Sequence, residues 1–436
     1  MTTPNRNNPI AGVTNPIAGV DVNQKSVLSN GLRVVTEEVP HFHSAAVGIW
    51  LNVGSRDETG AENGLTHFLE HMAFKGTPRR TVLDIAREID QLGGMCNAFT
   101  SKEQTCFHGR VLAEHLPRLV DLLGDLVLRS QLAAEDLDRE RQVILEEIYA
   151  QDDNPEELVQ VHFARNFWGD NAFGWPILGE AEHIGRVSRE DLIAFRRLTY
   201  RPADMLVAAA GRIRHQEVVD LVAASFEGFV NGSPGRERQA VTTQPGVYAL
   251  SRDLEQVNLV LGGPGVAAPD PRRYAATMLQ LVLGGNMSSR LFQVIREQLG
   301  LAYSIQSYAQ FFSDTGLVGI SAGVSPQNLP AIMAAIRREL KLLQEERVSE
   351  AELTAAKENL RGSVILSSED VDHLMGRLAK NELNFGRYIP QEDIIAGMVK
   401  VTADEVLEAA RDLLRPEAWG VALLGPVDKP DNYGLA

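Results

Sequence analysis

The hydrophobic positions of this chain recur with two periods, about two residues in some runs and about 3.6 residues in others. Runs with the shorter period predict β-strands, and runs with the longer period predict amphipathic helices. In the first half, strands are predicted over 31–36, 44–53, 95–100, 105–112 and 204–211, and helices over 81–92, 114–129, 135–152 and 214–226. The polar turn between the third and fourth of these strands makes them a predicted β-hairpin.

A similar order of elements follows the stretch 230–246, which is rich in Gly, Pro, Ser and Thr and is therefore predicted to be a linker. Residues 1–24, which contain the repeat Asn-Pro-Ile-Ala-Gly-Val, are interpreted as a flexible tail. The predicted fold class is α+β, with two similar halves, 25–229 and 247–436, in which helices pack on a mostly antiparallel sheet. In the second half, strands are predicted over 247–251, 257–262, 302–312, 316–324 and 418–424, and helices over 271–283, 328–345, 349–367, 370–384 and 403–413.

The chain carries 58 acidic and 42 basic residues and no Lys/Arg-rich run, which gives a net charge of −16. This balance argues against nucleic acid and anionic membranes as main partners. No apolar run is long enough to span a membrane, and the N-terminus lacks the charged and apolar segments of a signal peptide, so a cytoplasmic location is expected. The two cysteines, Cys96 and Cys106, are expected to be reduced thiols.

The first chemical signal is the motif His67-Phe68-Leu69-Glu70-His71. On a helix, at about 100° per residue, His67, Glu70 and His71 share one arc, while apolar residues occupy most of the remaining circumference. Two imidazoles one turn apart can ligate one metal ion, and the carboxylate beside them can take a proton from water at that metal. This H-x-x-E-H pattern is typical of a zinc hydrolase. The alternative is a helix that carries these three residues by chance.

A later amphipathic helix supplies a candidate third ligand. Glu140 and Glu147, two turns apart, fall inside the apolar arc of this helix, whereas Glu146 points to solvent. A carboxylate on the buried face of a helix is costly unless it is paired or bound to a cation. We therefore predict that Glu147 ligates zinc, with Glu140 behind it as an acceptor for a histidine N–H. The alternative is a buried salt bridge to an arginine such as Arg87 or Arg110.

These residues, with three further segments, resemble the pitrilysin/insulysin family of zinc peptidases, and within it the branch of the mitochondrial processing peptidase and its bacterial relatives. The resemblance extends over nearly the whole chain from about Ser26 and includes both halves. It implies a zinc-dependent endopeptidase with one Zn²⁺ per chain. The matching segments are 67–77, Gly93-Gly94, Asn97-Ala98-Phe99-Thr100, 140–148 and Arg296–Ser304.

The resemblance also implies roles for the candidate catalytic residues. His67, His71 and Glu147 would be the zinc ligands, and Glu70 would be the general base that activates the zinc-bound water and returns the proton to the leaving amine. Glu140, seven residues before Glu147, matches the family's spacing as well.

Other matches imply contacts with a peptide substrate. One match is to the edge strand on which the family binds its substrate as an added β-strand, and it comprises Asn97, Ala98 and Phe99. The alternatives are a turn asparagine at Asn97 and ordinary packing at Ala98. Arg296 and Tyr303, from the second half, match an arginine/tyrosine pair that in this family donates hydrogen bonds to the peptide and the tetrahedral intermediate. The alternatives are a helix-end arginine and a core tyrosine. Substrate handling is also implied for the glycine-rich loop at Gly284-Gly285, where the alternative is a helix-terminating turn.

Chain length bears on assembly. Family members near 430 residues contain half of the four-domain chamber that the long members close around a peptide, so the resemblance implies pairing. Because the zinc motif and the Arg296/Tyr303 pair occur in one chain, we expect a homodimer in which each site combines zinc from one protomer with arginine and tyrosine from the other. The alternatives are a heterodimer with a metal-free paralogue, and a catalytically silent structural or chaperone-like subunit. The intact set of motif residues disfavours a silent subunit.

Overall fold

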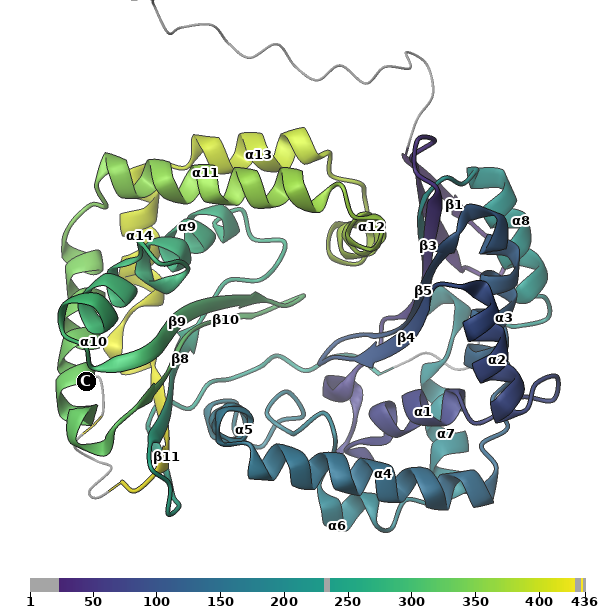
Figure 1. Cartoon of the computed structure of the whole chain (residues 1–436), viewed down its shortest axis with the longest axis horizontal. Coiled ribbons are helices and arrows are strands. Elements are labelled where there is room, and N and C mark those ends of the chain that lie inside the picture. Colours follow the sequence, from purple (N-terminus) through teal and green to yellow (C-terminus); the bar gives the residue numbers. More distant parts are fainter. Residues whose placement is uncertain (1–22, 231–235, 428–432, 434–436) are drawn as a thin grey trace, which may run out of the picture.

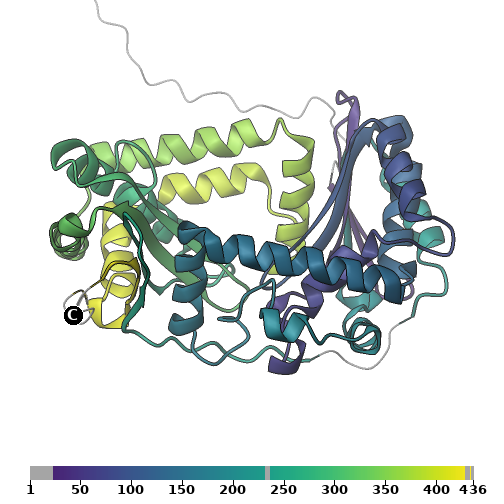
Figure 2. The same cartoon turned by 60° about the horizontal axis from the view of Figure 1, so that its bottom comes forward.

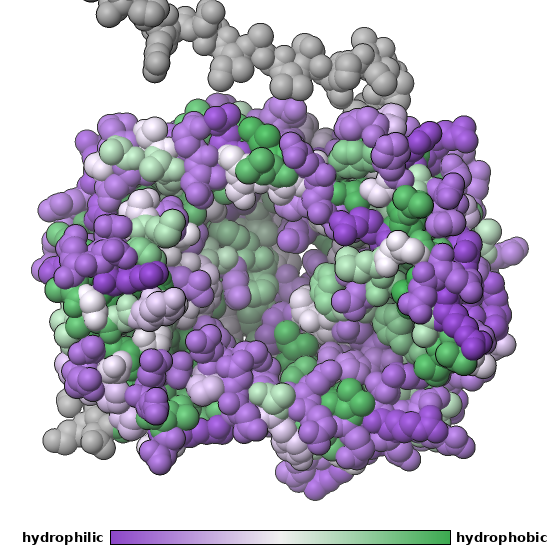
Figure 3. Space-filling view, in the orientation of Figure 1, coloured by the Kyte–Doolittle hydropathy of each residue, from purple (hydrophilic) through white to green (hydrophobic). Residues whose placement is uncertain are grey.

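The computed structural model describes residues 23–230, 236–427 and 433, and it has two mixed β-sheets, each packed with helices (Figure 1). The sheets lie on either side of a hollow, which the space-filling view shows open at the centre of this face (Figure 3). The predicted α+β class with two similar halves is confirmed. Most of the predicted tail and the linker residues 231–235 lie outside the described residues.

The first sheet has the strand order β1-β2-β6-β3-β5-β4, and all its neighbours are antiparallel except the parallel pair β2 and β6. Among the described residues β4 pairs with β5 alone, so its outer edge is available to another strand. The strands are β1 (Asn23–Val27), β2 (Arg33–Glu38), β3 (Ser44–Leu51), β4 (Met95–Thr100), β5 (Thr105–Leu112) and β6 (Met205–Gly211).

Helices of the first half cover one face of this sheet and enclose a core that includes Phe68, Phe107 and Phe195, all buried. Helix α2, predicted over 81–92, begins after Thr81, whose hydroxyl accepts the N–H of Asp84 in a capping box, and its last residue is followed by a left-handed glycine. The helices are α1 (Leu65–Ala73), α2 (Val82–Leu92), α3 (Leu116–Arg129), α4 (Ala134–Asp153), α6 (Ala181–Ile184), α7 (Arg189–Thr199) and α8 (His215–Ser225).

The second sheet, of order β7-β11-β8-β10-β9, repeats the plan with one parallel pair, β7 and β11, and with the hairpin strand β9 at its edge. The segment Phe292–Gln298, just before β9, is a π-helix, and α13 was not predicted. The elements are β7 (Val247–Ser251), β8 (Val257–Pro264), α9 (Arg273–Gly284), β9 (Ala302–Phe311), β10 (Gly316–Val324), α10 (Leu329–Glu345), α11 (Glu350–Ser367), α13 (Gln391–Lys400), α14 (Ala403–Leu413) and β11 (Gly420–Gly425).

The two halves exchange helices. Helix α5 (Pro155–Phe167), from the first half of the chain, packs on the second sheet, where Phe163 and Phe167 join a buried cluster with Val260 and Leu424. Helix α12 (Val371–Phe385), from the second half, packs on the free face of the first sheet, as Figures 1 and 2 both show. The halves are therefore held together by hydrophobic cores, not by the linker alone. No helix in the described part of the chain is both long and apolar enough to cross a membrane.

Candidate metal centre and its surroundings

The motif residues lie on α1, and a buried carboxylate holds the start of this helix in place. Glu58 accepts hydrogen bonds from the backbone N–H groups of Gly64 and Thr66, at 2.9 and 2.8 Å, and so supplies the acceptors that the first turn of a helix needs. Burial raises the pKa of Glu58 to about 7, against the opposing effect of its hydrogen bonds. Gly64 has a φ of +93°, and an added Cβ would lie 2.6 Å from Ile184, so glycine is required here.

Glu58→Ala is expected to lower the free energy of unfolding by about 1–3 kcal/mol, because it removes the acceptor from two buried backbone donors. Urea unfolding of the metal-free protein, followed by circular dichroism, measures the change. Glu227→Ala removes an exposed carboxylate and is the control, expected to change stability by less than about 0.5 kcal/mol. Equal midpoints for the two variants would contradict the capping role.

His67 and His71 from α1 and Glu147 from α4 converge on one point, as the sequence predicts. The Nε2 atoms of His67 and His71 each lie 3.6 Å from Oε2 of Glu147, and the three ligand atoms fit within 4.8 Å of one another. A tetrahedral zinc with bonds of about 2.0–2.2 Å separates its ligand atoms by about 3.3–3.6 Å. The donor set therefore fits a zinc ion with three protein ligands.

The electrostatics of the site agree with this fit. Burial, with a smaller contribution from neighbouring His71, lowers the pKa of His67 to about 3, so its imidazole is neutral at ordinary pH. A neutral imidazole is the form that ligates a metal. His67 is 8% exposed, whereas the side chain of Glu147 is 41% exposed, so the site is open on the side of the carboxylate.

Glu140 lies behind the metal donors, at the predicted place. Its Oε2 is 3.2 Å from Nδ1 of His71, and its Oε1 is 2.6 Å from Nζ of Lys75. The alternative was a buried salt bridge to an arginine such as Arg87 or Arg110. Glu140 does form a buried ion pair, but its partner is Lys75, and Arg110 pairs with Asp372 at 2.9 Å. A histidine ligand commonly donates its second N–H to such a carboxylate, which fixes the orientation of the ring.

Glu140→Gln is expected to weaken zinc binding by about 10–100-fold, because the amide lacks the charge that orients His71 and pairs with Lys75. Competition with a chromophoric chelator measures the affinity. Glu146→Gln, on the exposed side of the same helix, is the matched control. Identical affinities in the two variants would remove Glu140 from the support of the metal site.

Glu70, the remaining motif residue, lies beside the donors and contacts a residue that sequence reasoning missed. The hydroxyl of Thr100, the last residue of β4, donates to Oε2 of Glu70 at 2.5 Å. Burial raises the pKa of Glu70, and this hydrogen bond opposes the shift. A carboxylate with a raised pKa is suited to accept a proton near neutral pH. Thr100 belongs to a matching segment, but its pairing with Glu70 depends on how α1 packs against β4.

The candidate substrate strand is β4. Asn97 lies within the strand and not in a turn, and its Oδ1 accepts the N–H of Ala98 at 2.9 Å. Ala98 packs against the core, so the alternative of ordinary packing describes its side chain. Phe99 is 43% exposed, and its ring lies 6.0 Å from that of His108.

Arg296 and Tyr303 lie together but not at the metal donors. The guanidinium of Arg296 stacks on the rings of Phe292 and Tyr303, at 4.7 and 5.1 Å from their centroids. They belong to the π-helix and to the start of β9, in the left half of Figure 1, whereas α1 lies in the right half. Tyr303 is 84% exposed, so the alternative of a core tyrosine is wrong.

The glycines of the predicted substrate loop have a packing explanation. Gly284 ends α9, and an added Cβ there would lie 2.7 Å from the backbone N of Ser307 on β9. At Gly285 the Cβ would meet Leu281 at the same distance. The helix ends at this point, as in the helix-terminating alternative, and close packing explains both glycines. A role in substrate handling stays a prediction.

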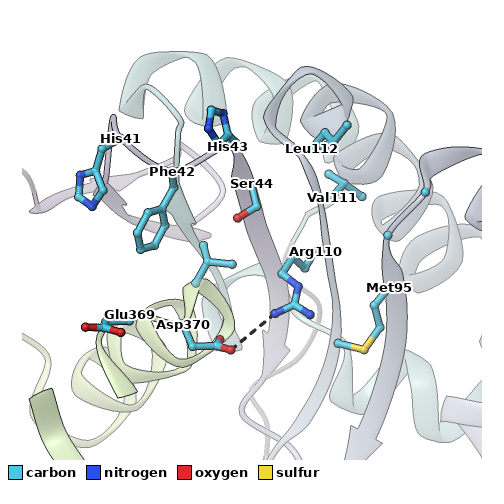
Figure 4. A pocket seen from close by; sticks show the side chains of 13 residues that line it. His41, Phe42, His43, Ser44, Met95, Arg110, Val111, Leu112, Glu369 and Asp370 are labelled. Atoms are coloured by element: carbon cyan, nitrogen blue, oxygen red, sulfur yellow. Dashed lines mark ion pairs between the residues drawn. The ribbon is translucent and has the colours of Figure 1, made fainter. Parts of the chain in front are cut away.

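A cavity of about 720 Å³ lies at the start of β4, away from its turn (Figure 4). Residues 41–44 and 93–95 of the first half form one side of it, and 369–371 of the second half form the other. Met95, Arg110 and Asp370 point into it, and the last two form an ion pair at 3.6 Å. The metal donors do not line it, so it contributes no group to the candidate site.

The sequence is similar to known zinc proteases along most of its length. The family profile described as Insulinase (Peptidase family M16) matches residues 33–181, and the profile described as Peptidase M16 inactive domain matches residues 186–360. An uncharacterized zinc protease of Streptomyces coelicolor is 42% identical over 94% of this chain and 91% of its own length. An uncharacterized zinc protease of Mycobacterium tuberculosis is 40% identical over 92% of this chain and 93% of its own length. An uncharacterized zinc protease of Bacillus subtilis is 35% identical over 91% of this chain and 97% of its own length.

Two solved structures share the fold. A protease from Helicobacter pylori has a TM-score of 0.87 at 22% identity and covers 93% of this chain and 99% of its own. A peptidase M16 inactive domain from Pseudomonas fluorescens has the same TM-score at 19% identity, over 93% and 98% of the two chains.

Proposed function

The chain belongs to the M16 (insulinase) family of zinc proteases, and from this premise we propose that it is a zinc-dependent endopeptidase that cleaves peptides or unfolded, presequence-like segments within a dimeric chamber. The observation that carries the proposal is the convergence of His67, His71 and Glu147, with Glu70 beside them.

In this proposal His67, His71 and Glu147 hold one zinc ion per chain. The ion supplies a Lewis acid that lowers the pKa of water and polarises a peptide carbonyl. Glu70 accepts the proton of the attacking water and passes it to the leaving amine, and its burial and raised pKa suit it to both transfers. Thr100 orients the Glu70 carboxylate, and Glu140 orients the imidazole of His71.

The substrate binds in extended form along the free edge of β4, with Asn97 and Ala98 opposite the residues around the scissile bond and Phe99 against one of its side chains. The support is that β4 is an edge strand and that its last residue, Thr100, contacts the proposed base. Peptide binding and proton transfer thus share one strand.

The proposed assembly is a homodimer. The support is that Arg296 and Tyr303 lie apart from the metal donors of their own chain and that Tyr303 is largely exposed, so both would be free to act at the site of another protomer. There a guanidinium and a phenol would donate hydrogen bonds to a peptide carbonyl or a developing oxyanion. A heterodimer with a metal-free paralogue is the alternative partner arrangement.

The proposal is tested by loading the purified chain with zinc and following an unstructured peptide by mass spectrometry. The expected result is one zinc per chain together with endoproteolytic cleavage. A zinc-loaded chain that cleaves nothing, alone or with added cell extract, would favour the catalytically silent subunit. Cleavage that appears only with extract would favour a separate partner chain.

Thr100→Val is expected to lower kcat by about tenfold with little change in KM, because it removes one hydrogen bond to a charged group and leaves the strand in place. Thr100→Ser keeps the hydroxyl and is expected to retain most of the activity. Zinc content should be equal in both variants and the wild type. Equal kcat for the valine and serine variants would contradict the role given to Thr100.

A further inference from the structure

A cavity of about 540 Å³ lies between the two halves of the chain, next to the candidate site; we call it the interhalf pocket. Its size lies within the range of about 300–1,000 Å³ found for ligand pockets. The first half contributes the β4–β5 turn, the end of α4, the middle of α5 and the loop 168–177, and the second half contributes the end of β9 and the start of β10. Neither half forms it alone.

Two residues that line the pocket are neighbours of the proposed catalytic centre along the chain. Ser101, which lines it, directly follows Thr100, the residue bonded to Glu70. Gln151, which also lines it, is one helical turn after Glu147 on α4, so both side chains lie on the same face of that helix. An extended peptide on β4 that passes the metal donors therefore reaches this pocket on the side of the β4–β5 turn.

The walls of the pocket are apolar and aromatic. Buried Phe173 makes edge contacts with Trp168 and Phe312, at 4.8 and 4.6 Å between ring centroids, and Trp175 and Phe311 are half-buried. The hydroxyl of Tyr308, which also lines the pocket, donates to Gln160 at 3.1 Å. Such walls bind a large apolar side chain by removing it from water.

The residues that line the pocket offer no counter-charge to a basic occupant. None of the described residues that line it is acidic, although the chain carries a net charge of −16. Its cation is Lys102, which donates to the carbonyl of Trp175 and whose pKa is lowered to about 8 by burial. A lysine or arginine side chain would lose its hydration there without gaining a counter-charge.

An ion cluster centred on the buried Arg56 holds the two walls together. Arg56, with a side chain 2% exposed, pairs with Glu103 of the β4–β5 turn at 2.5 Å and with Asp314 of the β9–β10 turn at 2.8 Å. Ser313 also donates to Glu103, at 2.6 Å, and the Arg56 guanidinium stacks on Phe173. The tips of both hairpins are thus tied together behind Phe173, which lines the pocket, so the two walls are held in place before a ligand binds.

We propose that the interhalf pocket binds an aromatic or branched aliphatic side chain of the peptide substrate, on the side of the scissile bond nearer to the β4–β5 turn. The proposal rests on the endopeptidase function and names the residue class that this function selects. The pocket supplies specificity and takes no part in the proton transfers.

The test is a set of unstructured peptides with one cleavage site, in which Phe, Ala or Lys is placed at each position on either side of that site. At one position the wild type is expected to prefer Phe over both Ala and Lys by roughly tenfold or more in kcat/KM. Val161→Phe fills the pocket from α5 and is expected to abolish this preference while the Ala peptides are still cleaved.

Phe42→Ala, in the cavity of Figure 4, is the matched control and is expected to keep the preference. A preference for Lys at every position, or a Phe preference that survives both Val161→Phe and Trp175→Ala, would overturn the pocket assignment while leaving the peptidase intact. Absence of cleavage for all peptides would instead contradict the endopeptidase function itself.

Discussion

Glu70→Gln is expected to bind zinc as the wild type does and to lose about 10²–10⁴-fold in kcat, the usual contribution of a general acid–base group. The glutamine keeps the shape of the side chain and can still accept the hydrogen bond of Thr100, but it cannot take a proton. The metal donors His67, His71 and Glu147 are untouched, so the loss reports proton transfer and not metal binding.

Peptide cleavage under saturating substrate gives kcat, and atomic absorption of the dialysed protein gives the zinc content. Glu146→Gln makes the same chemical change at an exposed position of α4 and is expected to behave as the wild type. A Glu70→Gln variant with wild-type turnover would remove Glu70 from the mechanism. A variant that loses both zinc and activity would give Glu70 a part in metal binding.

Mixed dimers of Glu70→Gln and Arg296→Ala chains are expected to recover activity that neither parent has. If each site takes its base from one protomer and its arginine from the other, a mixed dimer contains one intact site of two and shows about half of the wild-type activity. Arg296→Ala homodimers should lose about 10²–10³-fold, as expected when a donor to the oxyanion is removed.

Two different affinity tags isolate the mixed dimer, and its mass verifies the composition. The matched control pairs Glu70→Gln with a Glu70→Gln/Arg296→Ala chain and must stay inactive, because no intact base remains. A verified mixed dimer without activity would show that each site is built within one chain. A protein that is monomeric while active would contradict the shared site altogether.

Much of the fold could be predicted because its signals are local. The hairpin strands Met95–Thr100 and Thr105–Leu112 agree with the prediction to the residue, since a polar turn separates two alternating runs. The exchange of α5 and α12 could not be predicted. An amphipathic pattern indicates that one face of a helix is buried, but it does not indicate which sheet that face packs against.

The candidate site likewise contains contacts that the sequence predicts and contacts that it does not. Helical spacing places His67, Glu70 and His71 on one arc, and the apolar arc predicted for α4 singles out Glu140, which is buried, and Glu147, which is half-exposed. The other contacts depend on tertiary packing, which no spacing encodes: Glu58 at the start of α1, Lys75 on Glu140, and Thr100 on Glu70.

Net charge was similarly uninformative about the substrate. A value of −16 suggests affinity for basic peptides, yet the interhalf pocket has no acidic group among the described residues that line it. Total charge describes the average surface, whereas selectivity depends on the few groups at one cavity.

The measurement that tests the central claim most directly is cleavage of a mixed set of unstructured peptides by the purified chain, before chelation, after chelation and after zinc is returned. We expect cleavage that chelation abolishes and stoichiometric zinc restores, with His67, His71 and Glu147 as its ligands. Cleavage that persists in protein shown to be free of metal would contradict the account.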